Sequence, residues 1–201
     1  MNFPNRLTVS RIVLTFVFML ALFSHGLIAK IMAFAVFLTA SLTDWLDGYF
    51  ARRDNEISDF GKLMDPIADK ILVLSAFLAF IELGLVPAWM VVIIVFRELA
   101  VTGTRIMALT KNIVLPAREG GKNKTFSQMA AIIIILISLI LKEIGIRSAY
   151  PWSPSIEACF NKAIFILMFI TTALTLISGG SFLYRNRSLF MNNKRNADFK
   201  K

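Results

Sequence analysis

The chain has 201 residues, of which 57% are hydrophobic and only 17% are charged, and its mean hydropathy is +0.68. This composition is too apolar for a soluble domain of this size and indicates an all-α, polytopic membrane protein. The formal net charge of +9 does not indicate nucleic-acid binding, because the basic residues gather in particular connections between apolar runs.

Six apolar runs predict six transmembrane helices in a single membrane domain over residues 1–201, with no soluble domain attached. A membrane helix needs about 20 apolar residues, or about 17 at the short end. The two runs beside the conspicuous aspartates therefore suffice only if their polar ends leave the hydrocarbon. The six runs lie at residues 12–28, 31–46, 67–86, 88–103, 126–141 and 160–183.

The segment before the first run is expected to form a short N-terminal amphipathic lead-in at residues 3–8. Asn5 or Thr8 could cap the membrane helix that follows. The first run lacks a small-residue cleavage site, so we expect a signal anchor rather than a cleaved signal peptide. Farther along, Gly84 and Pro87 predict the turn between the third and fourth runs.

Four aspartates lie where the second run ends and the third begins, and their spacing is helical. Asp44 and Asp47 are three residues apart, and Asp65 and Asp69 are four apart, so each pair shares a helix face. Together, the four carboxylates would repel one another unless divalent cations bound between them. Proton relay in a transporter, or pairing with arginine, explains isolated carboxylate pairs equally well.

The residues around the aspartates suit a diphosphate. Gly48 and Ala51 would let a nucleotide or diphosphate approach the backbone, as would Gly61, and Arg52 offers a planar donor fork for phosphate oxygens. The only histidine, His25, falls at a turn predicted on the other side of the membrane. Oxygen ligands that suit Mg²⁺ or Mn²⁺ are therefore expected, and one carboxylate could accept a proton from an attacking hydroxyl.

The joint pattern over residues 44–69 is D-x-x-D-G-x-x-A-R, eight residues, then G-x-x-x-D-x-x-x-D. It resembles the signature of the CDP-alcohol phosphotransferase family at all eight fixed positions. The chain length and the six apolar runs extend the resemblance to the whole chain. Members of this family transfer a substituted phosphate from a CDP-linked donor to an alcohol and release CMP.

The resemblance implies a role for each fixed position. Asp44, Asp47 and Asp65 would ligate two divalent ions, Mg²⁺ or Mn²⁺, and Asp69 would be the catalytic base and a further metal ligand. A homodimer is also implied. The expected CDP-binding residues are Gly48, Ala51, Arg52 and Gly61.

Shorter blocks at residues 2–12, 96–99 and 121–125 are similar to those of bacterial phosphatidylglycerophosphate synthases, a branch of this family. They imply CDP-diacylglycerol as donor and sn-glycerol 3-phosphate as acceptor. The product would be phosphatidylglycerophosphate, in phosphatidylglycerol biosynthesis. Within the family, serine, an inositol phosphate, or phosphatidylglycerol (as in a cardiolipin synthase) remain alternative acceptors. Outside it, the alternative is a small proton-coupled transporter, whose acids should spread along several helices toward both faces.

A basic group is expected to bind the acceptor phosphate. Arg97 lies deep in the fourth run, where an unpaired charge would cost on the order of a few kcal/mol. It is either neutralised by an acid such as Glu98 or contributes to a cytoplasmic pocket for an anionic acceptor. The candidates for that pocket are Arg97, Arg105, Arg118, Lys122 and Lys124.

The basic residues also predict the orientation. They concentrate before the first run, after the second and fourth, and in the tail at residues 185–201. By the positive-inside rule, both termini and the aspartates then lie on the cytoplasmic side of the bacterial inner membrane. The basic tail is expected to favour this topology and contact with anionic lipid.

Overall fold

The computed structural model describes the backbone of residues 3–50, 59–110, 119–148 and 152–187, and the side chains of residues 10–43, 70–108, 124–148 and 152–187. These ranges contain six helices and no strand, which confirms the predicted all-α class. The helices are α1 (Phe3–Phe23), α2 (Leu27–Phe50), α3 (Asp59–Glu82), α4 (Ala88–Thr110), α5 (Glu119–Arg147) and α6 (Pro154–Arg185).

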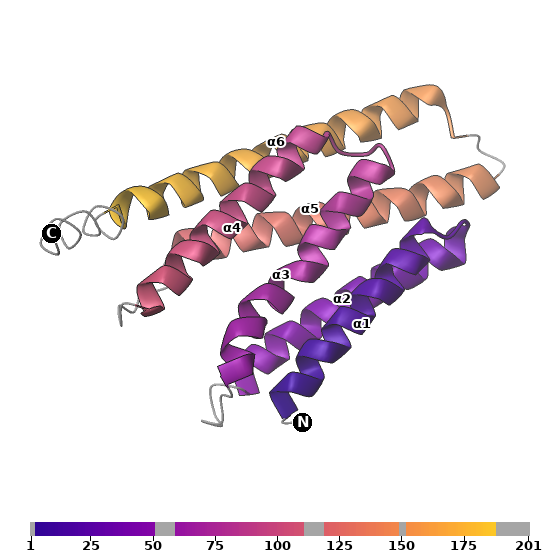
Figure 1. The fold of residues 1–201 in the computed structure, drawn as a ribbon. Helices are drawn as coiled ribbons and strands as arrows, with labels where there is room; N and C mark the ends of the chain where they lie inside the picture. Colours follow the sequence, from indigo (N-terminus) through magenta and orange to yellow (C-terminus); the bar gives the residue numbers. More distant parts are fainter. Residues whose placement is uncertain (1–2, 51–58, 111–118, 149–151, 188–201) are drawn as a thin grey trace, which may run out of the picture.

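The helices run alternately up and down, in two groups (Figure 1). Helices α1, α2 and α3 pack together, while α6 packs on both α4 and α5. Contacts of α5 with α2 and α3, and of α3 with α4, join the groups. The first residues of α1, α3 and α5 and the last residues of α2, α4 and α6 share one end of the bundle (Figure 1). We call it the signature end, because the aspartates lie on the helix termini there.

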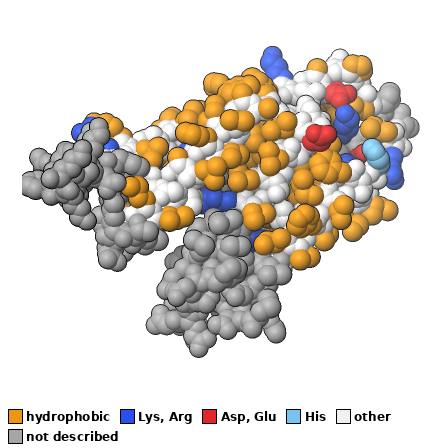
Figure 2. All heavy atoms as spheres, in the orientation of Figure 1, with side chains coloured by type: hydrophobic (Ala, Val, Ile, Leu, Met, Phe, Trp, Pro, Cys, Tyr) orange, Lys and Arg blue, Asp and Glu red, His pale blue; other side chains and the backbone are white. Residues whose placement is uncertain are grey.

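Apolar side chains fill the bundle and also cover much of its exterior. The ring of Phe18 on α1 packs 5.7 Å, centroid to centroid, from that of Phe37 on α2, and both residues are fully buried. Large exposed side chains include Phe16, Phe96 and Phe169. Hydrophobic side chains spread over much of the described part of the face in Figure 2. An apolar exterior of this extent is typical of a surface in contact with lipid.

Two helices of the described chain are long and apolar enough to cross a membrane, by length and composition. They are Lys124–Arg147 in α5 and Pro154–Arg185, which is α6. Shorter apolar stretches occur at Ser10–Phe23 and Leu27–Thr43. The described ranges contain six helices, and that all six span the membrane remains a prediction.

The first turn comes earlier than the sequence predicts. Helix α1 ends at Phe23, and Gly26 takes a φ of +100°, which glycine adopts without the steric penalty of a Cβ. Lys30 donates hydrogen bonds to the carbonyl oxygens of Leu22 (2.6 Å) and Ser24 (3.0 Å). Its ammonium group thereby satisfies carbonyls at the end of α1 that have no helical partner.

Two further local predictions have opposite outcomes. The turn predicted at Gly84 and Pro87 is confirmed: it separates α3 from α4, and Gly84 has a φ of +68°. The helix caps predicted at Asn5 and Thr8 are wrong, because α1 runs without a break from Phe3. Residues 3–8 are therefore the start of the first helix rather than a separate lead-in segment.

Candidate functional site

The aspartate signature lies on the ends of α2 and α3 at the signature end, where both helices pack on α1 and touch each other at a few positions. Asp44, Asp47 and Gly48 fall in the last turns of α2, and Gly61, Asp65 and Asp69 fall in the first three turns of α3. Ala51 and Arg52 lie outside the described residues, as do the side chains of the other six positions. The metal-binding, catalytic and CDP-binding roles of these residues therefore stay predictions.

The backbone at the aspartates suits the predicted donor set. Both pairs lie in continuous helix, so the spacings of three and four residues place each pair on one helix face. Four carboxylates from two helix ends at the same end of the bundle fit hard divalent cations. Elsewhere, no group of three or more His, Cys, Asp or Glu side chains suitable for a metal occurs among the side chains that the structure describes.

A cluster of charged side chains lies immediately beyond Asp69 along α3. Glu98 of α4 is its centre: one carboxylate oxygen, Oε1, accepts from Nη1 of Arg97 at 3.1 Å and also from Nζ of Lys124 on α5. The other oxygen, Oε2, lies 4.0 Å from Nζ of Lys70 on α3. We call these four residues the Glu98 cluster. It draws side chains from three helices to one carboxylate.

The Glu98 cluster is largely buried and carries surplus positive charge. The side chains of Glu98, Arg97 and Lys124 are 5%, 9% and 9% exposed, and that of Lys70 is 23% exposed. Three cations and one carboxylate leave two positive charges among these four side chains. Because charges removed from water are costly unless they are paired, the cluster favours a bound anion.

Helix α6 supports Arg97 from the other side. Nη2 of Arg97 donates to Oγ of Ser178 at 3.0 Å. A Cβ atom at Gly179 would overlap the Cγ atom of Arg97, so the glycine gives the arginine stem room to lie against the helix. A second polar contact links α5 to α6 close to the cluster along the chain: Nε2 of Gln128 donates to Oγ1 of Thr175 at 3.4 Å. The guanidinium is thus held by Glu98 at one end and by Ser178 at the other.

The structure brings together two of the five predicted acceptor-binding residues, Arg97 and Lys124. It also confirms the contact between Arg97 and Glu98 that the sequence left as the alternative to acceptor binding. Arg105 is instead exposed, and its guanidinium carbon lies 5.7 Å from the ring centroid of Phe182 on α6. Arg118 lies outside the described residues, and the side chain of Lys122 lies outside the described side chains.

Lys70 belongs to the cluster, although it was not among the acceptor-binding residues predicted from the sequence. The available signal was a cation directly after Asp69, at the start of an apolar run. The cost of placing a charge in such a run, which singled out Arg97, applies to Lys70 as well.

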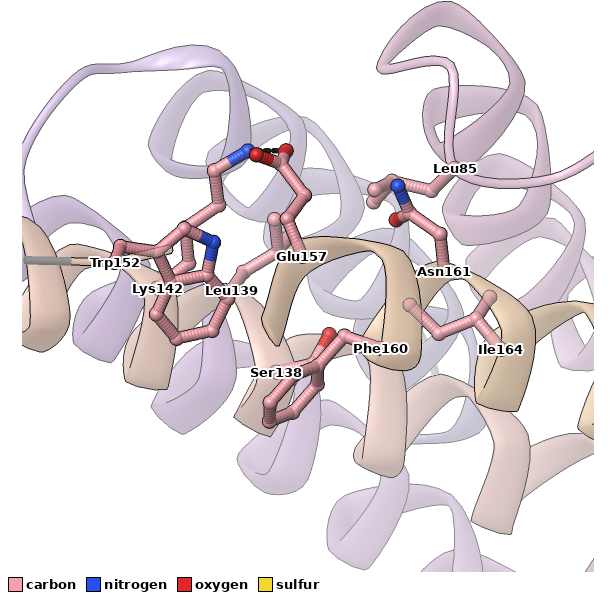
Figure 3. Close-up of a pocket in the computed structure, with 9 residues that line it drawn as sticks. All are labelled: Leu85, Ser138, Leu139, Lys142, Trp152, Glu157, Phe160, Asn161 and Ile164. Atoms are coloured by element: carbon pink, nitrogen blue, oxygen red, sulfur yellow. Dashed lines mark hydrogen bonds and ion pairs between the residues drawn. The ribbon is translucent and has the colours of Figure 1, made fainter. Parts of the chain in front are cut away.

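A small pocket lies far from the signature, where α5 and α6 meet the turn between α3 and α4 at the opposite end of the bundle. Figure 3 shows the residues that line it. Lys142 and Glu157 form an ion pair of 2.5 Å beside it, and the ring of Trp152 packs 5.1 Å from that of Phe160, centroid to centroid. Its volume of about 20 Å³ holds a single water molecule, which excludes a nucleotide. Its lining residues are Leu85, Ser138, Leu139, Lys142, Trp152, Glu157, Phe160, Asn161 and Ile164.

Comparison with known proteins decides the family. Residues 1–177 match the family model described as CDP-alcohol phosphatidyltransferase, which covers most of the chain. The chain belongs to this family. CDP-alcohol phosphatidyltransferases are enzymes that generally use divalent metal ions, so the resemblance read from the signature is confirmed at the level of the family.

Two individual relatives of this CDP-alcohol phosphatidyltransferase cover more than nine-tenths of it, and a third covers about two thirds. It is 34% identical over 197 residues to a CDP-diacylglycerol–glycerol-3-phosphate 3-phosphatidyltransferase of Bacillus subtilis, covering 92% of this chain and 95% of the relative. A protein of the same description from Rickettsia bellii is 32% identical over 189 residues, with coverages of 94% and 97%. A probable phosphatidylglycerophosphate synthase of Mycobacterium tuberculosis is 43% identical over 141 residues, or 69% and 67% of the two chains.

Proposed function

We propose that this protein transfers the phosphatidyl group of CDP-diacylglycerol to sn-glycerol 3-phosphate, giving phosphatidylglycerophosphate and CMP. Relatives named for this reaction, similar over more than nine-tenths of the chain, support the proposal. The observation in this molecule that supports a phosphorylated acceptor is the Glu98 cluster. Its two surplus positive charges suit a phosphate monoester dianion, such as glycerol 3-phosphate or an inositol phosphate, whereas serine has no net charge to balance them. Between the two phosphates, the names of the relatives favour glycerol 3-phosphate.

The donor end of the reaction is assigned to the aspartate signature. Asp44, Asp47 and Asp65 would hold two divalent ions, Mg²⁺ or Mn²⁺, with Asp69 as a further ligand. When bound, such ions neutralise a diphosphate and stabilise the charge that develops on the departing phosphate. The proposed CDP-binding residues are Gly48, Ala51, Arg52 and Gly61.

The acceptor end is assigned to Arg97 and Lys124, together with Lys70. Each lysine ammonium has three N–H donors and the guanidinium of Arg97 has five, so donors remain beyond those that Glu98 and Ser178 engage. Arg118 and Lys122 precede Lys124 in the chain and remain proposed contributors from outside the described side chains. Arg105 is exposed and lies over the ring of Phe182, and its in-plane N–H groups would remain available to the acceptor there.

The chemical step needs a base near the acceptor phosphate. We assign this role to Asp69, whose Cα is about 3.8 Å from that of Lys70 because the two residues are adjacent in the chain. Asp69 accepts the proton of the free terminal hydroxyl, and that oxygen forms a bond to the β-phosphorus. The bond from this phosphorus to the bridging oxygen breaks, and CMP leaves with the electron pair. Only three carbons separate the reacting hydroxyl from the phosphate of the acceptor, which suits a base beside the cation cluster.

The membrane arrangement follows from the same proposal. All six helices would cross the bilayer, with both termini and the signature end on the cytoplasmic side, where soluble glycerol 3-phosphate is present. The donor's acyl chains would remain in lipid beside the apolar exterior. A homodimer is proposed as the functional assembly, on the family resemblance.

An assay of the purified protein tests this function. CDP-diacylglycerol is supplied with glycerol 3-phosphate, serine, an inositol phosphate or phosphatidylglycerol in turn, and CMP release is measured. We expect release with glycerol 3-phosphate, loss of activity after metal removal by a chelator, and recovery when Mg²⁺ or Mn²⁺ is restored. Release with another alcohol only would overturn the acceptor, and no release with any alcohol would overturn the enzymatic activity.

A further inference from the structure

We infer that Glu98 is a positioning residue for the acceptor: its carboxylate gathers Lys70, Arg97 and Lys124 so that their remaining N–H donors converge on one phosphate dianion. This inference rests on the proposed function, because it concerns the binding of glycerol 3-phosphate. Glu98 itself is not assigned a contact with either substrate.

The geometry divides the carboxylate among the three cations. Oε1 serves Arg97 and Lys124, and Oε2 faces Lys70, so cations from α3, α4 and α5 are tied to a single side chain. Long basic side chains lose much rotamer freedom when they are ordered, and like charges repel one another. A central carboxylate offsets both effects before the substrate arrives, so less of the binding free energy is spent on ordering the site.

The charge of the cluster distinguishes it from an ion pair that only stabilises the fold. A structural pair matches one cation to one acid, as Lys142 and Glu157 do at the opposite end. Around Glu98, three cations share one acid inside a largely buried site. The surplus of two charges has the magnitude that a phosphate monoester dianion neutralises.

The arginine of the cluster also retains unused N–H groups. Nη1 and Nη2 of Arg97 each donate once, to Glu98 and to Ser178, so one N–H group on each nitrogen remains for a dianion. Nε is buried against α6 beside Gly179 and does not contribute. The two contacts fix the plane of the guanidinium, so its remaining N–H groups keep a constant direction, as dianion binding requires.

The test compares Glu98→Gln with Glu157→Gln in the CMP-release assay, varying each substrate in turn. Glutamine keeps the shape of the side chain and removes its charge. We expect Glu98→Gln to raise the KM for glycerol 3-phosphate at least tenfold and to change the KM for CDP-diacylglycerol less than twofold. Glu157→Gln removes the acid of the Lys142–Glu157 pair at the opposite end, and it should leave both KM values unchanged.

A second variant, Glu98→Asp, covers the case in which Glu98→Gln does not fold. It keeps the charge on a shorter side chain, so the KM for glycerol 3-phosphate should rise at least threefold, but less than in the glutamine variant. An unchanged KM in a folded variant would overturn the positioning role. A lowered KM would also overturn it, because Glu98 would then compete with the phosphate. Failure of the wild-type protein to release CMP with glycerol 3-phosphate would instead refute the proposed function.

Discussion

Helix α5 carries a lysine paired with a glutamate toward each of its ends, and the two pairs differ in burial. At the signature end, the side chains of Lys124 and Glu98 are 9% and 5% exposed. At the opposite end, those of Lys142 and Glu157 are 39% and 43% exposed. The first pair is joined by Arg97 and Lys70 and the second is not joined by another described cation.

The comparison shows that a lysine–glutamate pair can have a different role depending on its burial and its neighbours. An exposed pair is screened by water and contributes about 0–1 kcal/mol to folding. Several cations that share one buried carboxylate leave a local excess of positive charge. This excess can bind an anion, which the exposed pair cannot do in the same way. We therefore expect function to depend on the signature end, and changes at the opposite end to affect stability alone.

The largest expected effect tests whether the chemistry lies at the signature end. Asp69→Asn should lower kcat by about 10²–10⁴-fold, because a positioned base contributes a factor of that order. Binding of CDP-diacylglycerol, measured by equilibrium dialysis with a radiolabelled donor, should largely persist. Asp59→Asn, on the same helix but outside the signature, is the control. Near-normal turnover of the Asp69 variant would refute its role as the base.

The next effect concerns stability at the two glutamates. Glu98→Gln should lower the free energy of unfolding by about 3–5 kcal/mol, because it leaves buried cations without their counter-charge. Glu157→Gln should lower it by no more than about 1 kcal/mol. Chemical unfolding in detergent, followed by circular dichroism, measures both values. Equal losses would show that burial does not separate the two pairs.

A smaller effect is expected from crowding Arg97 through α6. Gly179→Ala should lower the free energy of unfolding by about 1–3 kcal/mol, because the new Cβ overlaps the arginine stem. It should also raise the KM for glycerol 3-phosphate severalfold. Gly180→Ala is the matched control, since a Cβ there meets no atom within 4 Å, and it should change stability by less than about 0.5 kcal/mol. Identical behaviour of the two variants would contradict the support of Arg97 by α6.

The smallest effect repeats this experiment at the opposite end. A Cβ at Gly145 would overlap the ring of Trp152, so Gly145→Ala should destabilise the protein by about 1 kcal/mol. The KM values for both substrates should not change. Gly103→Ala, where a Cβ would meet nothing within 4 Å, controls for the added methyl group. A raised KM in the Gly145 variant would show that the two ends are coupled.

Most of the fold could be predicted from apolar runs and turn residues. Gly84 and Pro87 mark the turn between α3 and α4. Glycine permits the positive φ that ends α3, and proline has no N–H group to continue a helix. The end of α1 was misplaced because Leu27 and Ile28, just beyond the turn, are apolar and extend the run, and hydropathy does not reveal a positive φ at Gly26. The caps at Asn5 and Thr8 failed because a polar residue can also lie inside a helix.

The site was predicted unevenly for the same physical reason. The aspartates recur at helical spacing within 26 residues of chain, so their relation is visible in a one-dimensional pattern. Arg97 stood out because a charge in an apolar run is costly. Glu98 was recognised only as one neutraliser for Arg97, and Lys70 was overlooked, because their shared contacts depend on how three helices pack.

The sequence by itself therefore determined the membrane class, the signature, the family and the reaction type. These properties depend on composition and on residues close together in the chain. The tertiary structure alone decided which cations meet, since Lys70, Glu98 and Lys124 lie on separate helices and Ser178 on a fourth. A buried carboxylate gains its partners from helix packing, and local sequence spacing contains no information about distances between helices.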